Sequence, residues 1–419
     1  MTEDLLTPPL DGIRVVDLTT FLSGPFGTQM LVDLGAEVIK VEPLAGDSSR
    51  SIPPHFVGED SAYFLANNRS KRSVAIDLKD PDGLDAVRKL IAAADVVVEN
   101  FRPGVCERLG LSPRELRAQR PDLIWVSISG FGQVGPWKDK PAYDMIVQAL
   151  SGVMSLTGEP EPGRPAVRLG IPAGDLVAGM FAAFGTLAAY IRRLRTGKGA
   201  QLDVSMLDSQ LVMTSYQAVY AMLSGVTPGP QGARHDSIPT YRSFRGGDDR
   251  EFVVTANTER MWQGLCRVIG RPELIDDERF ATPGGRLAHR DELWPVLEAA
   301  FTQKDAATWV QLLEQERVPC ALIKTVTEAL DDARESGHQM VVELTDDEGH
   351  AVEVVGNPVR LIGEQGYEPQ EYAYPPKLGE HSRDLLREVG VTEAAITAME
   401  ERGVLGVRPP HPEPVVRAE

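Results

Sequence analysis

The chain has 419 residues, of which 42% are hydrophobic and 25% are charged, as in an ordinary globular protein long enough for two domains. A formal net charge of −18 argues against nucleic acid as a partner, so an anionic ligand would need a local cluster of basic residues. Cys106, Cys266 and Cys320 lie far apart, which predicts neither a metal site nor a disulfide framework. We find no signal peptide and no unbroken apolar run of about 20 residues, and expect a cytoplasmic protein without a membrane partner.

The first predicted unit is a strand over residues 13–18, a helix over 28–34 and a strand over 37–42. A crossover this short predicts a parallel pair of strands. The loop between the first strand and the helix holds only Gly24 and Gly27 instead of the full G-x-G-x-x-G pattern. The sequence therefore does not favour a nicotinamide dinucleotide site.

The alternation of strands and helices continues to about residue 130. Three apolar segments at 74–78, 95–99 and 123–129 predict further strands. Helices are predicted in the segments 81–94, 104–109, 112–119 and, after a glycine-rich loop, 143–151. This pattern predicts an α/β fold with a parallel sheet.

The segment Gly170 to Gly199 stands out because a carboxylate precedes a long apolar run. Pro172 and Gly174 are expected to break regular structure, which predicts Asp175 as the N-cap of a helix. The run carries Leu176, Met180, Phe184, Leu187 and Ile191 at helical spacing and predicts a buried helix that ends at Gly197. From this stretch alone Asp175 is either a simple cap or a carboxylate with a chemical role.

The second half of the chain predicts a smaller α+β domain. After a strand at 200–205 and a helix at 206–223, the Gly/Pro-rich stretch 225–232 is the best candidate linker. The smaller domain should include a pairing of 341–344 with 351–355. A tail from Pro409 is expected to be disordered. The predicted boundaries are 1–224 for a large domain, 233–361 for a small domain, and 362–419 for a linker and terminal helices that return to the large domain.

Loops at the carboxyl ends of the predicted strands, together with residues 67–72, carry many basic residues. In an open parallel sheet this edge binds ligands, so the cluster predicts a phosphorylated ligand; the alternative is a solvated basic face. The residues concerned are Lys40, Arg50, Arg69, Lys71, Arg72, Arg102, Lys138 and Lys140, with Arg108 one helical turn beyond.

At this point the chain resembles a known family, the class III CoA-transferases of the L-carnitine dehydratase/bile acid-inducible protein F type, which also include formyl-CoA transferase and 2-methylacyl-CoA racemase. The matching segments follow the family order over about the first 210 residues, and Gly379-Glu-His-Ser matches as well. They are Gly12–Leu18, Gly24-Pro25, Leu34–Glu42, Asn68–Ser73, Asp95–Gly104, Ser129–Gly132, Ala142–Asp144, Gly174-Asp175 and Arg195–Gly199.

The resemblance implies a Rossmann-like large domain, split between the two ends of the chain, with the small domain inserted. It also implies an interlocked homodimer, acyl-CoA and a carboxylic acid as substrates, and no metal or tightly bound cofactor. In the transferases of this family, the residue that corresponds to Asp175 attacks the thioester. An aspartyl anhydride forms first and an aspartyl-CoA thioester second.

Several residues take roles from the same resemblance. Asn100, Phe101 and Arg108 match positions that contact CoA, and Lys140 lies close to such a position. We add Arg72 and Arg102 from the basic loops as candidate CoA-binding residues. We also expect the helix end to favour an ionised Asp175, its free amides to help an oxyanion, and Gly174 to let the thioester approach the backbone.

Tyr143 bears on the type of reaction. The racemases carry a histidine at this position, and a tyrosine with a pKa near 10 is a poor shuttle for an α-proton. Tyr143 therefore favours transfer, as a polar helper of Asp175, over racemisation. A racemase and a non-catalytic acyl-CoA-binding protein are the alternatives. The apolar loop Phe21-Leu22-Ser23 suggests an acid larger than formate or oxalate, and His235 and Tyr241 are further candidates for contact with substrate.

Overall fold

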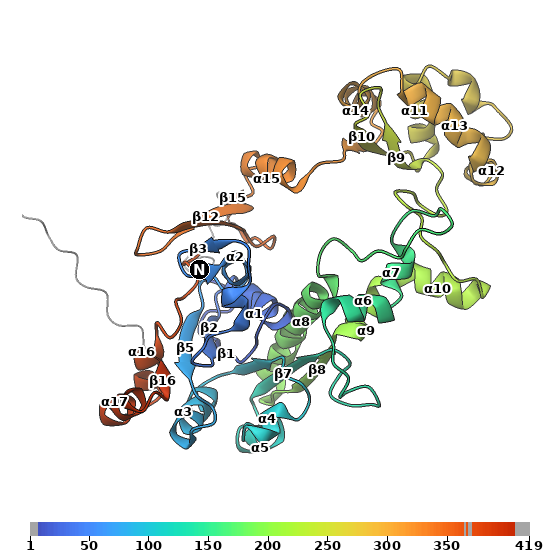
Figure 1. The fold of residues 1–419 in the computed structure, drawn as a ribbon. Coiled ribbons are helices and arrows are strands. Elements are labelled where there is room, and N and C mark those ends of the chain that lie inside the picture. Colours follow the sequence, from blue (N-terminus) through green and yellow to red (C-terminus); the bar gives the residue numbers. More distant parts are fainter. Residues whose placement is uncertain (1–6, 364–365, 368–370, 407–419) are drawn as a thin grey trace, which may run out of the picture. The chain divides into compact units, whose positions relative to one another are not determined.

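In a computed structural model, which describes residues 7–363, 366–367 and 371–406, the chain divides into two compact units. The large unit comprises Met1–Val153, Arg168–Val219 and His338–Glu419, and the small unit comprises Met154–Val167 and Tyr220–Gly337. The large unit thus takes its parts from both ends of the chain (Figure 1).

The centre of the large unit is a seven-stranded sheet in the order β16-β5-β2-β1-β6-β7-β8. All neighbours pair in parallel except β16, which runs antiparallel to β5. The parallel sheet predicted from the alternation is therefore present, with β1 in the middle. The strands are β1 (Arg14–Asp17), β2 (Glu37–Glu42), β5 (Arg72–Ile76), β6 (Val96–Glu99), β7 (Ile124–Ser129), β8 (Gln201–Ser205) and β16 (Leu405–Gly406).

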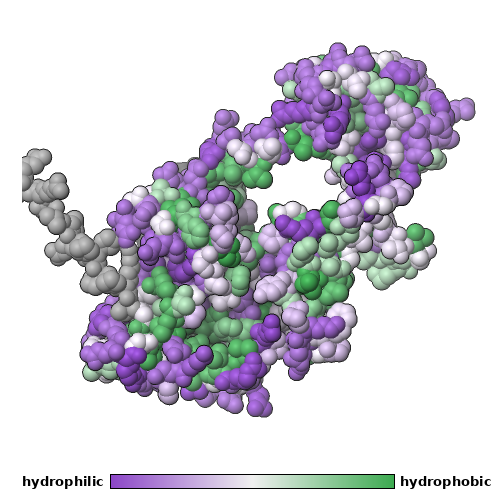
Figure 2. All heavy atoms as spheres, in the orientation of Figure 1, coloured by the Kyte–Doolittle hydropathy of each residue, from purple (hydrophilic) through white to green (hydrophobic). Residues whose placement is uncertain are grey.

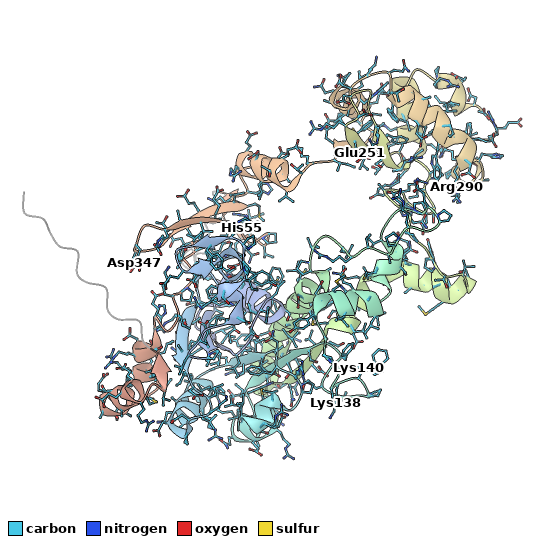
Figure 3. The ribbon with its side chains drawn as sticks, in the orientation of Figure 1. His55, Lys138, Lys140, Glu251, Arg290 and Asp347 are labelled. Atoms are coloured by element: carbon cyan, nitrogen blue, oxygen red, sulfur yellow. The ribbon has the colours of Figure 1, made fainter. Side chains whose placement is uncertain are left out.

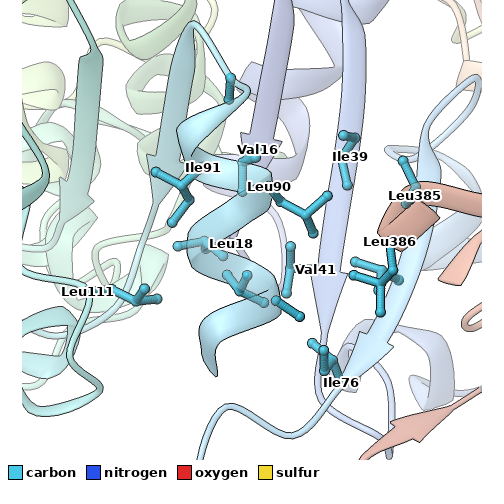
Figure 4. Packing of buried hydrophobic residues seen from close by; sticks show 14 of the residues in the cluster. Val16, Leu18, Ile39, Val41, Ile76, Leu90, Ile91, Leu111, Leu385 and Leu386 are labelled. Carbon is cyan, nitrogen blue, oxygen red and sulfur yellow. The ribbon is translucent and has the colours of Figure 1, made fainter. Parts of the chain in front are cut away.

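Helices cover both faces of this sheet, so alternate residues of one strand enter different cores. Val16 of β1 packs among residues of α3, α16 and α17, whereas Val15 packs among residues of α1, α8 and α9. Figure 4 shows the first of these cores between strands and helices. Burial on both faces explains the continuous Val/Ile runs of these strands. The helices are α1 (Ser23–Val32), α3 (Pro81–Ala92), α4 (Val105–Arg108), α5 (Pro113–Gln119), α6 (Asp144–Leu150), α8 (Ala173–Thr196), α9 (Met206–Met213), α16 (Ser382–Glu388) and α17 (Glu393–Glu401).

Helix α1 begins at Ser23, five residues before the predicted start at Thr28. Pro25 is tolerated there because the first turn of a helix needs no amide donor. Gly27 lies within the helix, where a Cβ atom would come within 2.8 Å of the carbonyl oxygen of Gly179 on α8. Gly27, one of the residues that suggested a loop, is thus a residue that lets α1 and α8 touch.

Helix α8 begins at Ala173 with Pro172 as N-cap, so Asp175 is its third residue, and the predicted N-cap assignment was wrong. The predicted C-terminus is correct, because Gly197 follows the last turn with a φ of 68°. The predicted burial is only half right. The buried face consists of small residues such as Gly179, Ala182 and Ala183.

Several large apolar residues of α8 face outward, with Met180, Phe184 and Ile191 at 49%, 68% and 50% exposure, whereas Leu187 packs against the core. The reason is the contact with α1, which leaves no room for a larger side chain at Gly179. By length and composition α8 is also the one described helix that could cross a membrane. This is a weak indication, because core helices of soluble proteins have the same properties.

The predicted helix at 206–223 is two helices, α9 and α10 (Ser215–Ser224), separated where Ser215 has a φ of 45°. The small unit has an antiparallel sheet in the order β11-β10-β9 beside a core that includes Phe252, Phe301 and Trp309. Its elements are β9 (Tyr241–Arg245), β10 (Glu251–Thr255), α11 (Glu259–Val268), α12 (Pro283–Ala288), α13 (Arg290–Phe301), α14 (Ala306–Gln315), β11 (Cys320–Leu322) and α15 (Val326–Glu335).

The hairpin of β12 (Val341–Thr345) and β13 (Ala351–Val355) pairs as predicted but belongs to the large unit, whereas we placed it in a small domain ending at 361. Arg69 explains this, because its Nη1 atom donates to the carbonyl oxygen of Val355 at 2.8 Å. The predicted tail from Pro409 lies outside the described residues. The remaining short elements are β3 (Phe56–Val57), β4 (Asp60–Ser61), α2 (Ala62–Leu65), α7 (Val153–Leu156), β14 (Ile362–Gly363) and β15 (Gly366–Tyr367).

Candidate active site

A cavity of about 470 Å³ opens in the large unit at the carboxyl ends of β1, β6 and β7. The chain continues from β1 to one side of the sheet and reaches β6 on the other, so this is the point where the strand order reverses. Open α/β sheets bind ligands at such a switch point. Thr20 and Phe21 after β1, Asn100 and Phe101 after β6, and Asp175 of α8 are among the residues that line it.

Asp175 brings a partly buried carboxyl group to this cavity. Burial and the neighbouring carboxylate of Asp144 raise the pKa of Asp175 to about 7, and the Ser23 hydroxyl opposes this only in part. The expectation of a carboxylate whose ionisation is favoured by its helix end therefore differs from the structure. Near neutral pH this group exists both as an acid and as a nucleophilic anion.

Asp144, at the first position of α6, explains why the helix end does not stabilise Asp175. Its Oδ1 atom accepts hydrogen bonds from the amides of Gly174 at 2.7 Å and Asp175 at 3.4 Å. The amides that we expected to be free for an oxyanion are thus occupied. The reason for a glycine at 174 also changes, because a Cβ atom there would lie 3.0 Å from Asp144 Oδ1. Sequence reasoning missed Asp144, although it follows Tyr143 directly in a matching segment.

Two tyrosines line the same cavity. Tyr143, the expected polar helper, is 69% exposed, and its ring meets that of Phe21 edge-on with centroids 6.4 Å apart. Tyr63 was not predicted. Burial, followed by the carboxylates of Asp175 and Asp144, raises the pKa of Tyr63 to about 12, so its hydroxyl stays a hydrogen-bond donor at any physiological pH.

Asn100 lines the cavity, but its side-chain amide forms hydrogen bonds within the protein. Its Nδ2 atom donates to the carbonyl oxygen of Thr20 at 2.8 Å, and its Oδ1 atom accepts from the amide of Thr20 at 2.9 Å. Asn100 therefore ties the loop after β6 to the loop after β1. Phe101 lines this cavity and also a neighbouring one of about 310 Å³ at the ends of β2 and β5.

The predicted basic cluster separates into two groups. Arg102, Lys138 and Lys140 line the cavity, together with Arg168, which sequence reasoning did not single out. Figure 3 shows Lys138 and Lys140 on the loop that follows β7, and Lys140 Nζ lies 4.1 Å from the centre of the Trp137 ring. Arg108 ends α4 and is not among the lining residues.

The other basic residues are engaged in ion pairs that hold the large unit together. Arg72 lies at the start of β5, where parallel strands begin, and pairs with Glu37 at 2.6 Å and Glu388 at 2.7 Å. It is therefore at the edge opposite the cavity, contrary to our expectation. The buried pairs are Lys40–Asp47, Lys71–Asp17, Arg50–Glu42, Arg50–Asp60 and Arg69–Asp33.

One of these pairs shapes the cavity wall. Asp47 Oδ1 accepts from the amide of Phe21 at 3.2 Å, and Lys40 Nζ donates to the carbonyl oxygen of Thr19 at 2.9 Å. In the loop that these two hydrogen bonds hold, the backbone of Phe21 has a φ of 63°, which a bulky residue rarely adopts. The ion pair thus holds the loop after β1 in a strained conformation at the cavity.

The remaining candidates are not among the residues that line this cavity. His235 and Tyr241 lie in the small unit with their rings stacked 5.4 Å apart. Burial raises the pKa of the Cys266 thiol to about 12 and that of Cys320 to about 11, as expected of thiols without a reactive role. Asp346, Glu348 and His350 form the one described group with metal-ligand geometry, but Asp346 already pairs with Lys377 at 3.0 Å.

Comparison with known proteins shows the family to which the chain belongs. Residues 10–382 match the model of the CoA-transferase family III. The chain belongs to this family and is an enzyme that transfers CoA, in agreement with the resemblance found in its motifs.

Individual relatives are similar in sequence to this chain over nearly its whole length. The chain is 38% identical over 382 residues to succinyl-CoA:glutarate CoA-transferase of Mus musculus, covering 91% of this chain and 86% of the relative. It is 39% identical over 387 residues to acetyl-CoA:oxalate CoA-transferase of Acetobacter aceti, covering 92% and 97%. A crystal structure of a CaiB/BaiF family protein from Brucella suis matches with a TM-score of 0.79 at 35% identity, covering 91% and 99%.

Proposed function

We propose that the protein is an acyl-CoA:carboxylate CoA-transferase in which Asp175 is the nucleophile. The observation that carries this proposal is the place of Asp175, a partly buried carboxyl group at the switch-point cavity with a pKa raised to about 7. A carboxylate of raised pKa is both available and more nucleophilic than an ordinary aspartate.

The steps balance in charge and atoms. An oxygen of ionised Asp175 attacks the carbonyl carbon of the donor thioester, the C–S bond breaks, and an aspartyl anhydride and a CoA thiolate form. The thiolate attacks the Asp175 carbonyl carbon and releases the donor acid as a carboxylate, leaving an aspartyl-CoA thioester. The acceptor carboxylate then repeats these two steps in reverse and leaves as the new acyl-CoA. Tyr143 and Tyr63 supply hydroxyl donors beside these intermediates.

The basic rim of the cavity supports CoA as the substrate. Arg102, Lys138 and Lys140 face the phosphates in this proposal, with Arg108 further along the nucleotide. Phe101, which separates the two cavities, lies against the adenine. Asn100 contributes by fixing the loop after β1, and we leave Arg72 out because its guanidinium is paired at the other edge. No further cofactor is required.

For the acid we propose a dicarboxylate. The two relatives named above act on glutarate and oxalate, which both carry a second carboxylate. Arg168 lines the cavity on the segment that leads into α8 and supplies a cation for that group. Phe21 and Tyr143 form an apolar wall that suits a methylene chain between the two carboxylates.

We also propose that the enzyme acts in the cytoplasm as an interlocked homodimer, without nucleic acid or membrane as partner. Exposed large apolar residues gather on α6, α8, α9 and α10 (Figure 2). Monomeric proteins rarely expose large contiguous apolar patches, and α6, α8 and α9, which carry most of these residues, contact one another. The residues include Met145, Ile146, Leu150, Phe181, Phe184, Leu194, Leu211, Val212, Tyr216 and Leu223.

One observation favours a second function, an acyl-CoA racemase. A carboxyl group with a pKa near 7 is also a suitable general acid or base for an α-proton. Incubation with acyl-CoA in deuterated water, without an acceptor acid, separates the two functions. The transferase leaves the α-hydrogen in place, whereas a racemase exchanges it for deuterium.

Substitution of the nucleophile tests the proposal. Asp175→Asn keeps the size of the side chain but cannot form the anhydride, so we expect CoA exchange between acids to fall by at least about 10³-fold. Mass-spectrometric detection of the new acyl-CoA measures it, with succinyl-CoA as donor and glutarate as acceptor. A variant that exchanged CoA at the native rate would contradict the proposal.

A further inference from the structure

The amino end of α8 is closed by a side chain from another helix. Asp144 of α6 places its Oδ1 atom 2.7 Å from the amide nitrogen of Gly174 and 3.4 Å from that of Asp175. Pro172, the N-cap residue of α8, has no side-chain acceptor for these amides. Asp144 therefore caps the amino end of α8 as an N-cap residue would, although it lies about 30 residues earlier in the sequence.

Asp144 is itself fixed in place by Gln148, one turn further along α6. Gln148 Nε2 donates to Asp144 Oδ2 at 2.6 Å and to the carbonyl oxygen of Ile171 at 3.3 Å. Gln148 Oε1 accepts from the amide of Leu169 at 2.9 Å. One buried amide thus holds both the capping carboxylate and the segment that enters α8.

The cap has an electrostatic consequence for its neighbour. The first amides of a helix stabilise a nearby anion, and each such contact favours ionisation. At α8 the first amides donate to Asp144 and therefore stabilise its carboxylate. Asp175 is left beside a second carboxylate instead of the exposed helix end, and two like charges at close range oppose each other's ionisation.

We propose that Asp144 is a positioning residue that seats the first turn of α8 and sets the basicity of Asp175. This inference rests on the proposed role of Asp175 as the nucleophile. Asp144 forms no bond to the substrate in this scheme and acts through its hydrogen bonds and its charge.

The surroundings of Asp175 agree with this assignment. Its pKa is raised to about 7, first by burial and second by Asp144, while the Ser23 hydroxyl of α1 lowers it. Tyr63 of α2 faces the same two carboxylates and stays neutral, because its pKa is raised to about 12. The cations that line the cavity are Arg102, Lys138, Lys140 and Arg168, which we assign to the phosphates and the distal carboxylate.

The pKa of Asp175 determines how the rate of the reaction depends on pH. Only ionised Asp175 attacks the thioester, so the rate is full above its pKa and falls about tenfold per pH unit below it. Removal of the Asp144 charge lowers the pKa of Asp175, so the acid limb of the profile moves to lower pH. The anion is then less basic and less nucleophilic, so the plateau rate falls as well.

The test is the pH profile of kcat/KM for the Asp144→Asn variant. Asparagine keeps an oxygen for the amide of Gly174 and loses the charge, so we expect the acid limb to shift down by about one pH unit. Asp85→Asn is the matched control, since it removes the same charge from an exposed position of α3 outside the cavity lining and should leave the profile unchanged. An acid limb that stays at the wild-type position in Asp144→Asn would overturn the inference.

A second measurement stands if Asp144→Asn does not fold. In the wild-type protein with ¹³C-labelled aspartate, the Asp175 carboxyl resonance, assigned by its loss in Asp175→Asn, should titrate near neutral pH. Titration near the ordinary aspartate value would refute the inference in the native enzyme. Neither outcome tests whether Asp175 is the nucleophile. That proposal is tested separately and would fail if the Asp175→Asn variant exchanged CoA at an undiminished rate.

Discussion

Phe21 has a left-handed backbone conformation, with a φ of 63°, in the wall of the cavity. The hydrogen bond to Asp47 and the Lys40–Asp47 ion pair hold this loop, so local strain is balanced by buried contacts. Its ring is 40% exposed and reaches Tyr143 edge-on. The residue thus combines an unfavourable backbone with a side chain that faces the proposed acid site.

Comparison of two substitutions separates these properties. Phe21→Gly and Phe21→Ala both remove the ring, but only glycine adopts a positive φ without cost. We therefore expect the glycine variant to be more stable than the alanine variant by about 1 kcal/mol in the free energy of unfolding measured with urea. Equal stability of the two variants would show that the loop is not strained.

Single residues of the site could be predicted only where a motif carried them. Asp175 and Tyr143 follow from matching segments, and both line the cavity. Asp144 and Gln148 act through contacts to a segment 21 to 31 positions away in the sequence, which no local pattern records. Arg72 was misplaced because the basic run before β5 begins a strand, and in a parallel sheet this is the edge away from the ligand.

At the scale of elements, the contact of α1 with α8 decides where the nucleophile lies. Gly179 allows the two backbones to meet, because a Cβ atom there would lie 2.5 Å from the carbonyl oxygen of Ser23. Ser23 also interacts with the Asp175 carboxyl group. The packing of small residues therefore places the first turn of both helices at the cavity.

Substitution at Gly179 tests this contact. Gly179→Ala forces the helices apart, and we expect a loss of about 1–3 kcal/mol in the free energy of unfolding. Gly185→Ala on the same helix is the control, since the new methyl group meets only the end of the Leu202 side chain at 3.2 Å. The control should be neutral or gain up to about 1 kcal/mol from helix propensity. Equal effects at both positions in a thermal or chemical denaturation series would contradict the packing described here.

The elements could largely be predicted from the period of the apolar residues. Apart from the short elements β3, β4 and α2, the order of strands and helices through the first 130 residues follows the prediction, since strands buried on both faces leave a clear apolar run. The start of α1 was missed because glycine and proline also mark loops. The exposed face of α8 was missed because an apolar side chain does not reveal whether its own chain or another one covers it.

At the scale of the whole molecule, the division of the chain into two units and the apolar face of α8 both bear on assembly. The large unit draws on three separate segments, and its sheet is completed by the far end of the chain, which returns to place β16 beside β5. The sequence suggested this return through the matching Gly379-Glu-His-Ser motif. It did not show that the hairpin of β12 and β13 also returns, because the hydrogen bond from Arg69 to the carbonyl oxygen of Val355 joins segments far apart in the sequence.

The proposed dimer gives a prediction at this scale. Phe184 is 68% exposed on α8, and a charge there should oppose burial between two copies. Phe184→Glu is expected to sediment near 45.7 kDa, whereas the native protein sediments near twice that mass. Val326→Glu, which adds the same charge at an exposed position of the small unit, should remain a dimer. A native protein that sediments as a monomer would contradict this assembly.

The most direct measurement is a search for the covalent intermediate on Asp175. The enzyme is incubated with succinyl-CoA and treated with hydroxylamine, which converts an aspartyl anhydride or thioester to a hydroxamate, and the digested peptides are analysed by mass spectrometry. We predict the hydroxamate mass on the peptide that contains Asp175 and its absence from the Asp175→Asn variant. An unmodified Asp175 peptide from enzyme that is turning over, together with undiminished CoA transfer by the variant, would contradict the mechanism.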